Sequence, residues 1–249
     1  MRFSGSGGGG VTHPADQLLW VAQQGNATAR NSTAIAVSGL CTSASIVDST
    51  SARVYDAIGT AIQQNTSTAL FNTAYYQDQG GQYIAPEALP WLVTRWSISD
   101  AADIDSGVML MANKFFSQVS DCLNRTPVTA CVGFQYMTSA GDTTIKRIKA
   151  GTGGAGASVF DTGIAVADYT YPNVLIVSIR FLTATTCRVQ LFDASLPPTE
   201  GSALYDETIS AGLPTQELGA VMAIENQTTT SKAQYFYGLD IGTGGAVPT

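Results

Sequence analysis

Asp100, Asp103 and Asp105 bring three carboxylates into six consecutive residues, a short distance after Trp96. Carboxylates at such spacing can surround a hard cation such as Ca²⁺, and a tryptophan ring can stack on a sugar. The spacing of an EF-hand loop and its closing Glu are absent, which favours a turn held by Asp side chains. We therefore expect no resident metal and no cofactor, and regard these four residues as a possible ligand or cation site.

The other acidic residues do not form the carboxylate pair that a glycan hydrolase needs. Asp206 and Glu207 are adjacent, so on a strand they would point to opposite faces. Glu200, Glu217 and Glu225 fall in segments that we expect to be turns. Solvated surface carboxylates are the favoured interpretation of all five.

Nucleophilic catalysis by Ser or Cys normally requires a histidine base, and His13 is the only histidine. It lies beside Pro14 in a segment expected to be an arm. The run Gly151–Gly156 has the letters of a dinucleotide-binding fingerprint, but strand-like residues follow it where a helix start is required. The sequence therefore predicts a non-enzymatic protein.

Composition limits the partners. Charged residues make up 12% of the 249 residues, the net charge is −7 and the pI is about 4.5. Nucleic-acid binding needs clustered Lys and Arg, and the one basic cluster, Lys146–Lys149, is short. No apolar segment is long enough to span a bilayer. We expect neither a nucleic-acid nor a membrane partner; a surface poor in charge suits contact with neighbouring subunits, although secreted β proteins share this composition.

The four cysteines are irregularly spaced and form no zinc pattern. Cys122 and Cys131 flank a possible hairpin and could form a disulfide, but free buried thiols are the favoured interpretation.

Short runs rich in β-branched and aromatic residues, separated by turn residues, predict an all-β sandwich. In the run Trp91–Ile98, alternation places the odd-numbered residues on one face and the even-numbered residues on the other. Residues 100–107 are expected to form a loop. The runs expected to be strands are Thr33–Val37, Ala44–Val47, Arg53–Ile62, Trp91–Ile98, Val108–Met111, Ala130–Met137, 142–149, Asn173–Phe181, Cys187–Asp193 and Ala233–Ile241.

Residues 1–30 are interpreted as an N-terminal arm, and residues 31–249 as the sandwich domain. Glycines 5 and 7–10 predict a flexible start, and a short helix is possible after Pro14. We expect the arm to bind a neighbouring surface, although packing on its own domain is an equal alternative. The expected interface residues are Phe3, Val11, Leu18, Leu19 and Trp20.

Five features of residues 85–243 follow in a characteristic order: an aromatic strand containing Arg, a Gly-aromatic-polar-aromatic run, an Asp-Thr-Gly turn before an apolar strand, a further strand with a polar turn, and a final strand. They are Trp91–Ile98, Gly133–Tyr136, Asp161–Gly163 before Val174–Phe181, Arg188–Asp193, and Tyr235–Ile241. This order resembles the concanavalin A-like jelly-roll domains in virion proteins of tailed bacteriophages. The family's acidic and Asn residues for sugar and metal have no match, so carbohydrate activity is not carried over.

The resemblance implies an antiparallel jelly-roll β-sandwich in a virion, made in the host cytoplasm. The expected function is that of a capsid decoration or cement protein, which binds the major capsid protein or neighbouring subunits and forms a homo-oligomer. The alternative is a carbohydrate-binding adhesin module of a tail fibre or a secreted protein. Tyr169 and Tyr171, with other aromatics, could line a sugar platform, but core or interface roles are favoured for them.

Overall fold

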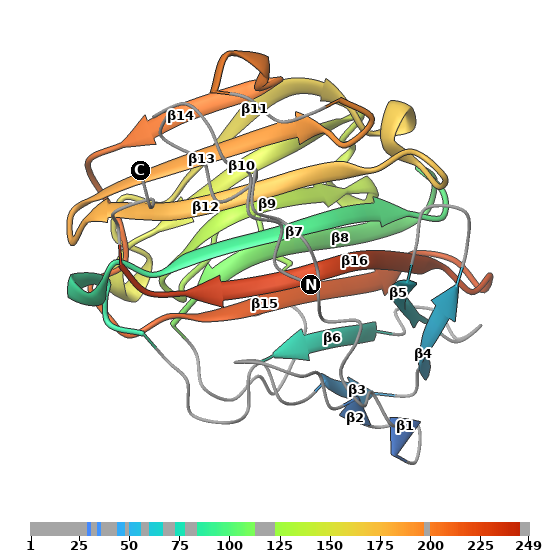
Figure 1. Ribbon diagram of the computed structural model, residues 1–249. Coiled ribbons are helices and arrows are strands. Elements are labelled where there is room, and N and C mark those ends of the chain that lie inside the picture. The colour runs from blue at the N-terminus through green and yellow to red at the C-terminus, as the bar shows by residue number, and fades with distance from the viewer. Residues whose placement is uncertain are drawn as a thin grey trace, which may run out of the picture.

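The computed structural model describes residues 84–112, 123–196 and 200–244, together with strand segments between residues 29 and 77 (Figure 1). The expected interface residues of the arm lie outside the described residues: they are Phe3, Val11, Leu18, Leu19 and Trp20. The arm and the boundary after residue 30 therefore stay predictions.

The described chain forms two antiparallel seven-stranded sheets, which lie one in front of the other in Figure 1. Sheet 1 contains, in spatial order, β11 (Ser158–Ala165), β10 (Thr144–Ala150), β9 (Cys131–Met137), β8 (Ile104–Met111), β15 (Gly219–Asn226), β6 (Thr73–Gln77) and β3 (Ala44–Val47). Sheet 2 contains β14 (Tyr205–Ile209), β13 (Thr186–Asp193), β12 (Leu175–Thr183), β7 (Trp91–Ile98), β16 (Ala233–Gly242), β5 (Thr60–Asn65) and β4 (Thr50–Tyr55).

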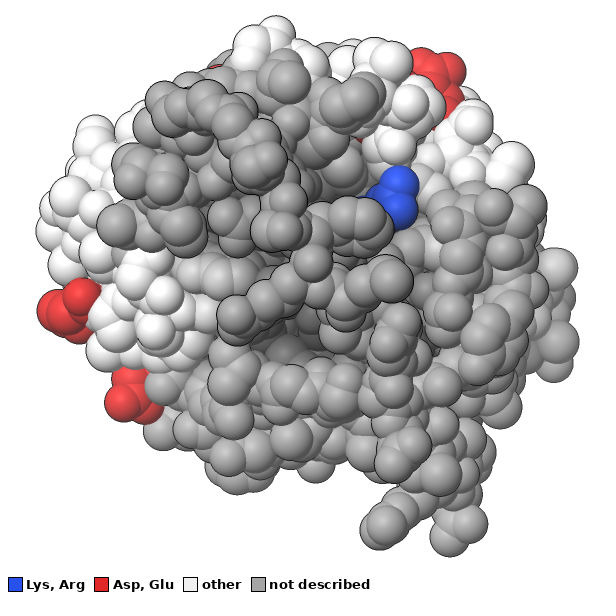
Figure 2. Space-filling model, viewed as in Figure 1, with Lys and Arg blue, Asp and Glu red and all other residues white. Residues whose placement is uncertain are grey.

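The remaining described elements are short. A separate antiparallel pair joins β1 (Ala29–Arg30) and β2 (Ala34–Ile35). The 3₁₀ turns are Pro86–Ala88, Thr138–Ala140, Thr152–Gly154, Val166–Tyr169 and Glu200–Ser202. The described part of the chain contains no helix long and apolar enough to cross a membrane. On the described part of the face in Figure 2, charged side chains are few and well separated.

The main core lies between the sheets and follows from strand alternation. Even-numbered residues of β7, such as Leu92 and Trp96, join Val108 of β8 and Phe134 of β9 in one buried cluster. Odd-numbered residues of β7 point the other way, and Val93 packs in a separate cluster on the outer face of sheet 2. The alternation predicted for Trp91–Ile98 is therefore confirmed, and it fixes which side chains are available to a site on that outer face.

Gly133 allows β8 and β9 to approach closely. A Cβ atom at this position would lie 2.3 Å from the carbonyl oxygen of Val108 and 2.5 Å from the Cβ of Met109. Both distances are too short for any side chain, so the Gly in the Gly133–Tyr136 run is required by the packing of the two backbones.

An ion pair between the buried Arg147 and the partly exposed Glu207 joins the two sheets at one side of the sandwich, from the strand next to the edge of sheet 1 to the edge strand of sheet 2. Arg147 of β10 donates to both carboxylate oxygens of Glu207 of β14, at 2.8 and 3.0 Å, and to the Ser158 hydroxyl at 2.9 Å. The guanidinium also stacks on the Phe160 ring at 5.5 Å. Bidentate pairs of this kind have strict geometry, so the contact fixes how the two edges meet.

The all-β fold and most strands confirm the sequence predictions. The expected loop at residues 100–107 is wrong in its second half, because β8 begins at Ile104. Glu225 was expected in a turn but lies on β15, which the sequence analysis missed. Arg53–Ile62 is divided between β4 and β5, which pair as a hairpin.

The two cysteines within the described residues, Cys131 and Cys187, are buried free thiols. The favoured interpretation of free buried thiols is therefore confirmed for these two, and Cys122 lies outside the described residues.

Candidate ligand-binding cavity

A cavity of about 380 Å³ opens on the outer face of sheet 2. Its floor includes Arg95 of β7, which belongs to the outward-facing residues of that strand. Its walls are two loops that meet at one end of the β12–β13 hairpin, where Leu175 pairs with Asp193. The lining residues are Arg95, Asp168, Tyr169, Pro172, Asn173, Val174, Asp193, Ala194 and Ser195.

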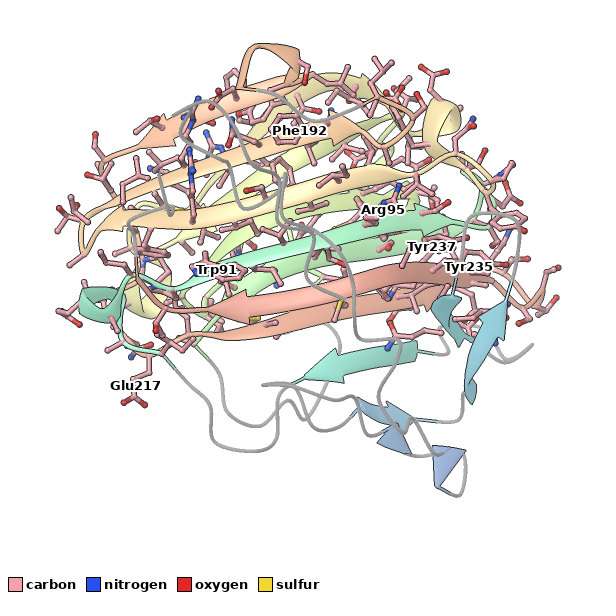
Figure 3. All side chains as sticks on the ribbon, viewed as in Figure 1. Trp91, Arg95, Phe192, Glu217, Tyr235 and Tyr237 are labelled. Carbon is pink, nitrogen blue, oxygen red and sulfur yellow. The ribbon has the colours of Figure 1, made fainter. Side chains whose placement is uncertain are left out.

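Arg95 is the cationic group of the cavity. Its Nη2 donates to the carbonyl oxygen of Ala194 at 3.4 Å, and its Nε is buried without a hydrogen-bond partner. Burial lowers the pKa of the guanidinium, while the nearby Tyr237 opposes this shift. Figure 3 shows Arg95 on β7 beside Tyr237 of β16. An arginine carries five N–H donors, so most of its hydrogen-bonding capacity remains for a ligand or solvent.

Asp168 and Asp193 supply carboxylates to the same cavity. Asp193 ends β13, and its Oδ1 accepts a hydrogen bond from the Ser195 amide at 2.8 Å, which orders the loop after the strand. Asn173 holds the opposite loop by donating to the Asp168 carbonyl at 3.0 Å. Among the described residues, neither carboxylate forms an ion pair with Arg95. The cavity thus offers a cation and two anions that have not neutralised one another.

Tyr169 lines the same cavity and also packs against the main core. Burial raises the pKa of its phenol, and the charges of Asp193 and Asp168 raise it further. The hydroxyl therefore stays protonated at neutral pH and can donate a hydrogen bond. Its backbone carbonyl accepts a bond from the Ser97 hydroxyl at 3.4 Å, which ties the wall to β7.

Tyrosine rings extend from the loop that forms one wall onto the surface of β16. Tyr171 is 41% exposed, and its ring centroid lies 4.9 Å from that of Tyr235. Tyr235 in turn stacks on Tyr237 with a centroid separation of 6.5 Å. Figure 3 shows Tyr235 and Tyr237 as neighbours on β16. Tyr171 thus presents an exposed aromatic surface next to the polar cavity.

The structure does not bring the sequence-predicted ligand residues together. Trp96 is 2% exposed and packs in the core between the sheets, so the core role favoured for the aromatic residues is confirmed for it and the possible ligand role is wrong. Its even-numbered position on β7 explains this outcome, because that face of the strand points inward. Arg95, one residue earlier, faces the cavity.

The three carboxylates also diverge. Asp100 accepts bonds from the Lys232 ammonium at 2.8 Å and the Ala102 amide at 2.9 Å, and the Lys232 bond contributes most to lowering its pKa. Asp103 is exposed and has a positive φ of 54°. Within the described residues, no group of three or more His, Cys, Asp or Glu side chains is placed to hold a metal ion.

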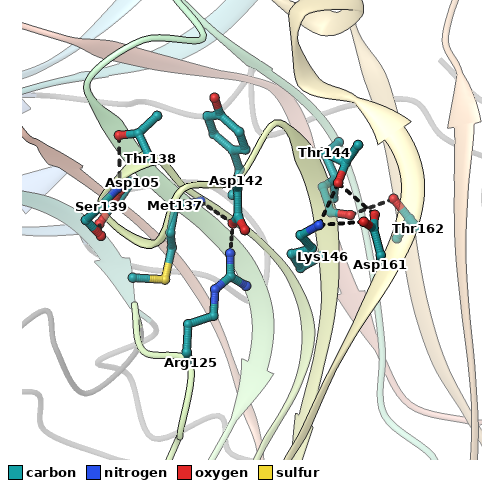
Figure 4. A network of polar contacts seen from close by, with 12 residues as sticks. Asp105, Arg125, Met137, Thr138, Ser139, Asp142, Thr144, Lys146, Asp161 and Thr162 are labelled. Atoms are coloured by element: carbon teal, nitrogen blue, oxygen red, sulfur yellow. Dashed lines mark hydrogen bonds and ion pairs between the residues drawn. The ribbon is translucent and has the colours of Figure 1, made fainter.

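Asp105 is 2% exposed and belongs to a hydrogen-bond network on sheet 1 (Figure 4). It accepts bonds from the Ser139 amide at 3.0 Å and from the Ser139 hydroxyl, and from Gln227 at 3.0 Å. Its carboxylate is committed to protein donors and anchors the Thr138–Ala140 turn. Asp105 therefore serves the structure of this turn.

No protein-family profile and no curated protein matches this sequence. A legume lectin-like domain from Entamoeba histolytica is 12% identical with a TM-score of 0.53, over 80% of this chain and 90% of that one. A Bacillus licheniformis β-glucanase is 9% identical with a TM-score of 0.49, over 77% and 82%. The alginate lyase A1-II′ of polysaccharide lyase family 7 is 11% identical with a TM-score of 0.49, over 77% and 83%.

The fold is a concanavalin A-like jelly-roll β-sandwich. This confirms the fold predicted from the sequence. Identities of 9–12% show the fold alone, and none of these comparisons bears on a virion.

The expectation of a non-enzymatic protein requires correction. Several solved structures similar to this chain are alginate lyases, and another is a β-glucanase. The exclusion of an enzyme rested on the missing carboxylate pair and histidine base, and the comparisons contradict it.

Sequence reasoning missed Arg95 as a functional residue, although it placed that side chain on the correct face. The available signal was a charged residue in the middle of an apolar strand, where a partner or a ligand is required. Tyr169 and Tyr171 were considered for a sugar platform, with core or interface roles favoured; Tyr169 lines the cavity, and Tyr171 lies in the loop that forms one wall. Asp168 and Asp193 gave no signal, because each is a common residue at a turn or strand end.

Proposed function

We propose that this chain is a carbohydrate-binding β-sandwich of a bacteriophage particle, acting as an adhesin module of the tail-fibre type. The observation that carries the proposal is the cavity on sheet 2, where polar groups converge beside an exposed tyrosine. The phage setting is supported only by the order of strand features described for the sequence.

The chemistry of the cavity suits a sugar. Asp168 and Asp193 are acceptors for ligand hydroxyls, while Arg95 and the Tyr169 hydroxyl are donors. Sugars present both kinds of group around one ring and have apolar faces that stack on aromatic side chains. A volume of about 380 Å³ falls within the range of about 300 to 1,000 Å³ for small-molecule sites.

The test is binding of the full chain to a glycan array, followed by calorimetry with the glycans that bind. Ser195→Trp would place a large ring in the cavity without removing a hydrogen bond, because Ser195 contributes its backbone amide to Asp193. We expect this variant to lose at least about tenfold in affinity, or about 1.4 kcal/mol.

Thr185→Trp is the matched control, since Thr185 is exposed in the turn at the opposite end of the β12–β13 hairpin. It should bind as the wild type does. Absence of binding to any glycan, or equal binding by the Ser195→Trp variant, would refute a saccharide site in this cavity.

A capsid decoration role remains the second candidate. It is supported by a sequence with 12% charged residues and by large apolar side chains exposed on the described surface. They are Val128, Phe160, Tyr171, Leu196 and Leu204. Deletion of residues 1–24 should then leave a folded protein that no longer attaches to particles, as measured by co-sedimentation. Attachment with unchanged affinity would count against the arm.

A further inference from the structure

Arg95 has more hydrogen-bonding capacity than its surroundings use. Among the described residues it makes one hydrogen bond, from Nη2 to the Ala194 carbonyl at 3.4 Å. This distance is at the long end for an N–H···O bond. Its Nε is buried and unpartnered, so this donor has lost its water without gaining an acceptor.

The group that best satisfies such a guanidinium is an oxyanion. A carboxylate can accept from the two Nη groups at the same time, which gives two charge-assisted bonds of matching geometry. A sugar hydroxyl supplies a single neutral acceptor and leaves the charge uncompensated. The partly desolvated cation therefore favours a ligand with a negative group at this point.

The two aspartates restrict that negative group further. Asp168 and Asp193 line the same cavity, so its formal charge together with Arg95 is −1. A phosphate monoester, with a charge between −1.5 and −2 at neutral pH, would be repelled more strongly by these carboxylates than a singly charged group. The same aspartates remain good acceptors for hydroxyls on the rest of the ligand.

We infer that the cavity binds a saccharide unit bearing a carboxylate, such as a uronic or sialic acid. The ligand carboxylate contacts Arg95, and its hydroxyls contact Asp168 and Asp193. This inference depends on the proposed saccharide function and specifies the class of sugar.

The experiment compares each acidic sugar with its neutral form. Oligosaccharides of galacturonate, glucuronate and sialic acid are titrated into the full chain beside their methyl esters, which keep the shape and remove the charge. Unmodified neutral glycans and a sugar phosphate complete the set. We expect at least one acid to bind at least about tenfold more tightly than its ester, with affinity for the acid falling as salt is added.

Two variants identify the residues responsible. Arg95→Gln should bring the ratio of acid to ester affinity close to one. Asp168→Asn removes an exposed charge beside the ligand and keeps a carbonyl oxygen as a hydroxyl acceptor, so it should strengthen binding of the acid more than binding of the ester. Circular dichroism and urea unfolding check that both variants fold, and the exposed position of Asp168 protects the second variant from a folding defect.

The outcomes separate this inference from the proposed function. Equal binding of acids and esters, with loss of both in the Ser195→Trp variant, would overturn the acidic sugar and leave a saccharide site in place. Preference for the sugar phosphate over every carboxylate would also overturn it. Failure of all glycans to bind would remove the proposed function itself.

Discussion

Arg147 and Arg95 each project from the middle of a strand, but their guanidinium groups have different surroundings. Arg147 points toward the interior and meets both oxygens of Glu207, a serine hydroxyl and a phenylalanine ring. Arg95 points outward into a cavity and has one long hydrogen bond to a carbonyl. The contrast distinguishes a cation that joins two sheets from a cation that is available to a ligand.

This difference shows which property of a buried arginine indicates that it binds a ligand. Burial alone does not, because the Arg147 side chain is only 6% exposed and is fully explained by its partners. A ligand-binding role is indicated when some N–H donors of the guanidinium have no acceptor in the protein and a cavity lies beside them. Arg95 meets both conditions, and the following predictions test whether the contrast is correct.

The largest expected effect is on the paired arginine. Glu207→Gln leaves Arg147 without its counter-charge in the closed edge of the sandwich, which should lower the free energy of unfolding by about 3 kcal/mol. Urea unfolding measures this. Asp206→Asn is the neighbouring control, because Arg188, the partner of Asp206, is more exposed than Arg147. An equal loss in both variants would mean that the edge contact has no special role.

The unpaired arginine should behave in the opposite way. Arg95→Met keeps much of the side-chain volume and removes a desolvated cation, so we expect the free energy of unfolding to change by less than about 1 kcal/mol. Binding of the acidic sugar should fall at least about tenfold. Destabilisation as large as that of Glu207→Gln would show that Arg95 is structural and would remove the contrast.

Phe160→Ala tests the aromatic contact of Arg147. Phe160 is 54% exposed and lies on the edge strand β11, so little of its effect should come from burial. Loss of the cation–π contact should reduce stability by about 0.5 to 1 kcal/mol. Thermal unfolding measures the change, and an unaltered melting temperature would limit the stabilisation of Arg147 to its ion pair.

Glu225 is a third charged group, and its ionised carboxylate is unfavourable in the folded protein. Burial raises the pKa of its carboxyl, and the charge of Asp105 on the paired strand raises it further, although Gln227 opposes the shift. A folded-state pKa above the unfolded value of about 4.3 favours folding at low pH, and this contribution is lost as the pH rises through the folded-state value. Glu225→Gln should therefore be more stable than the wild type at pH 7, by about 0.5 kcal/mol.

Urea unfolding at pH 7 and pH 4 checks the Glu225 prediction, because the advantage of the variant should disappear at the lower pH. A constant difference at both values would show that the carboxyl does not change its ionisation over this range.

Much of the fold followed from local pattern. Trp91–Ile98 and Asn173–Phe181 are rich in β-branched and aromatic residues, and both form strands of sheet 2 as predicted. β15 was missed because its residues Gly219 to Ala223 include Gly and Ala, which have weak strand preference. It forms a strand because β8 and β6 pair with it on both sides, which is information that no local window contains.

The site was harder to predict, for a related reason. Its floor and walls come from residues 95, 168–174 and 193–195, which are distant in sequence and meet only when β7, β12 and β13 align. Asp100, Asp103 and Asp105 were considered as a possible ligand or cation site because they are close along the chain. In the folded protein Asp100 pairs with the buried Lys232, Asp103 is exposed and Asp105 belongs to a buried network, while separated residues form the cavity.

The position of the cavity walls affects how such a protein can change. Both walls are short loops at one end of a single hairpin, whereas stability depends on the layers and their closed edge. Substitutions, or a few inserted residues between 193 and 196, would change the shape and charge of the cavity while leaving the scaffold unaltered. A library randomised in this loop would sample different cavity surfaces on one unchanged framework.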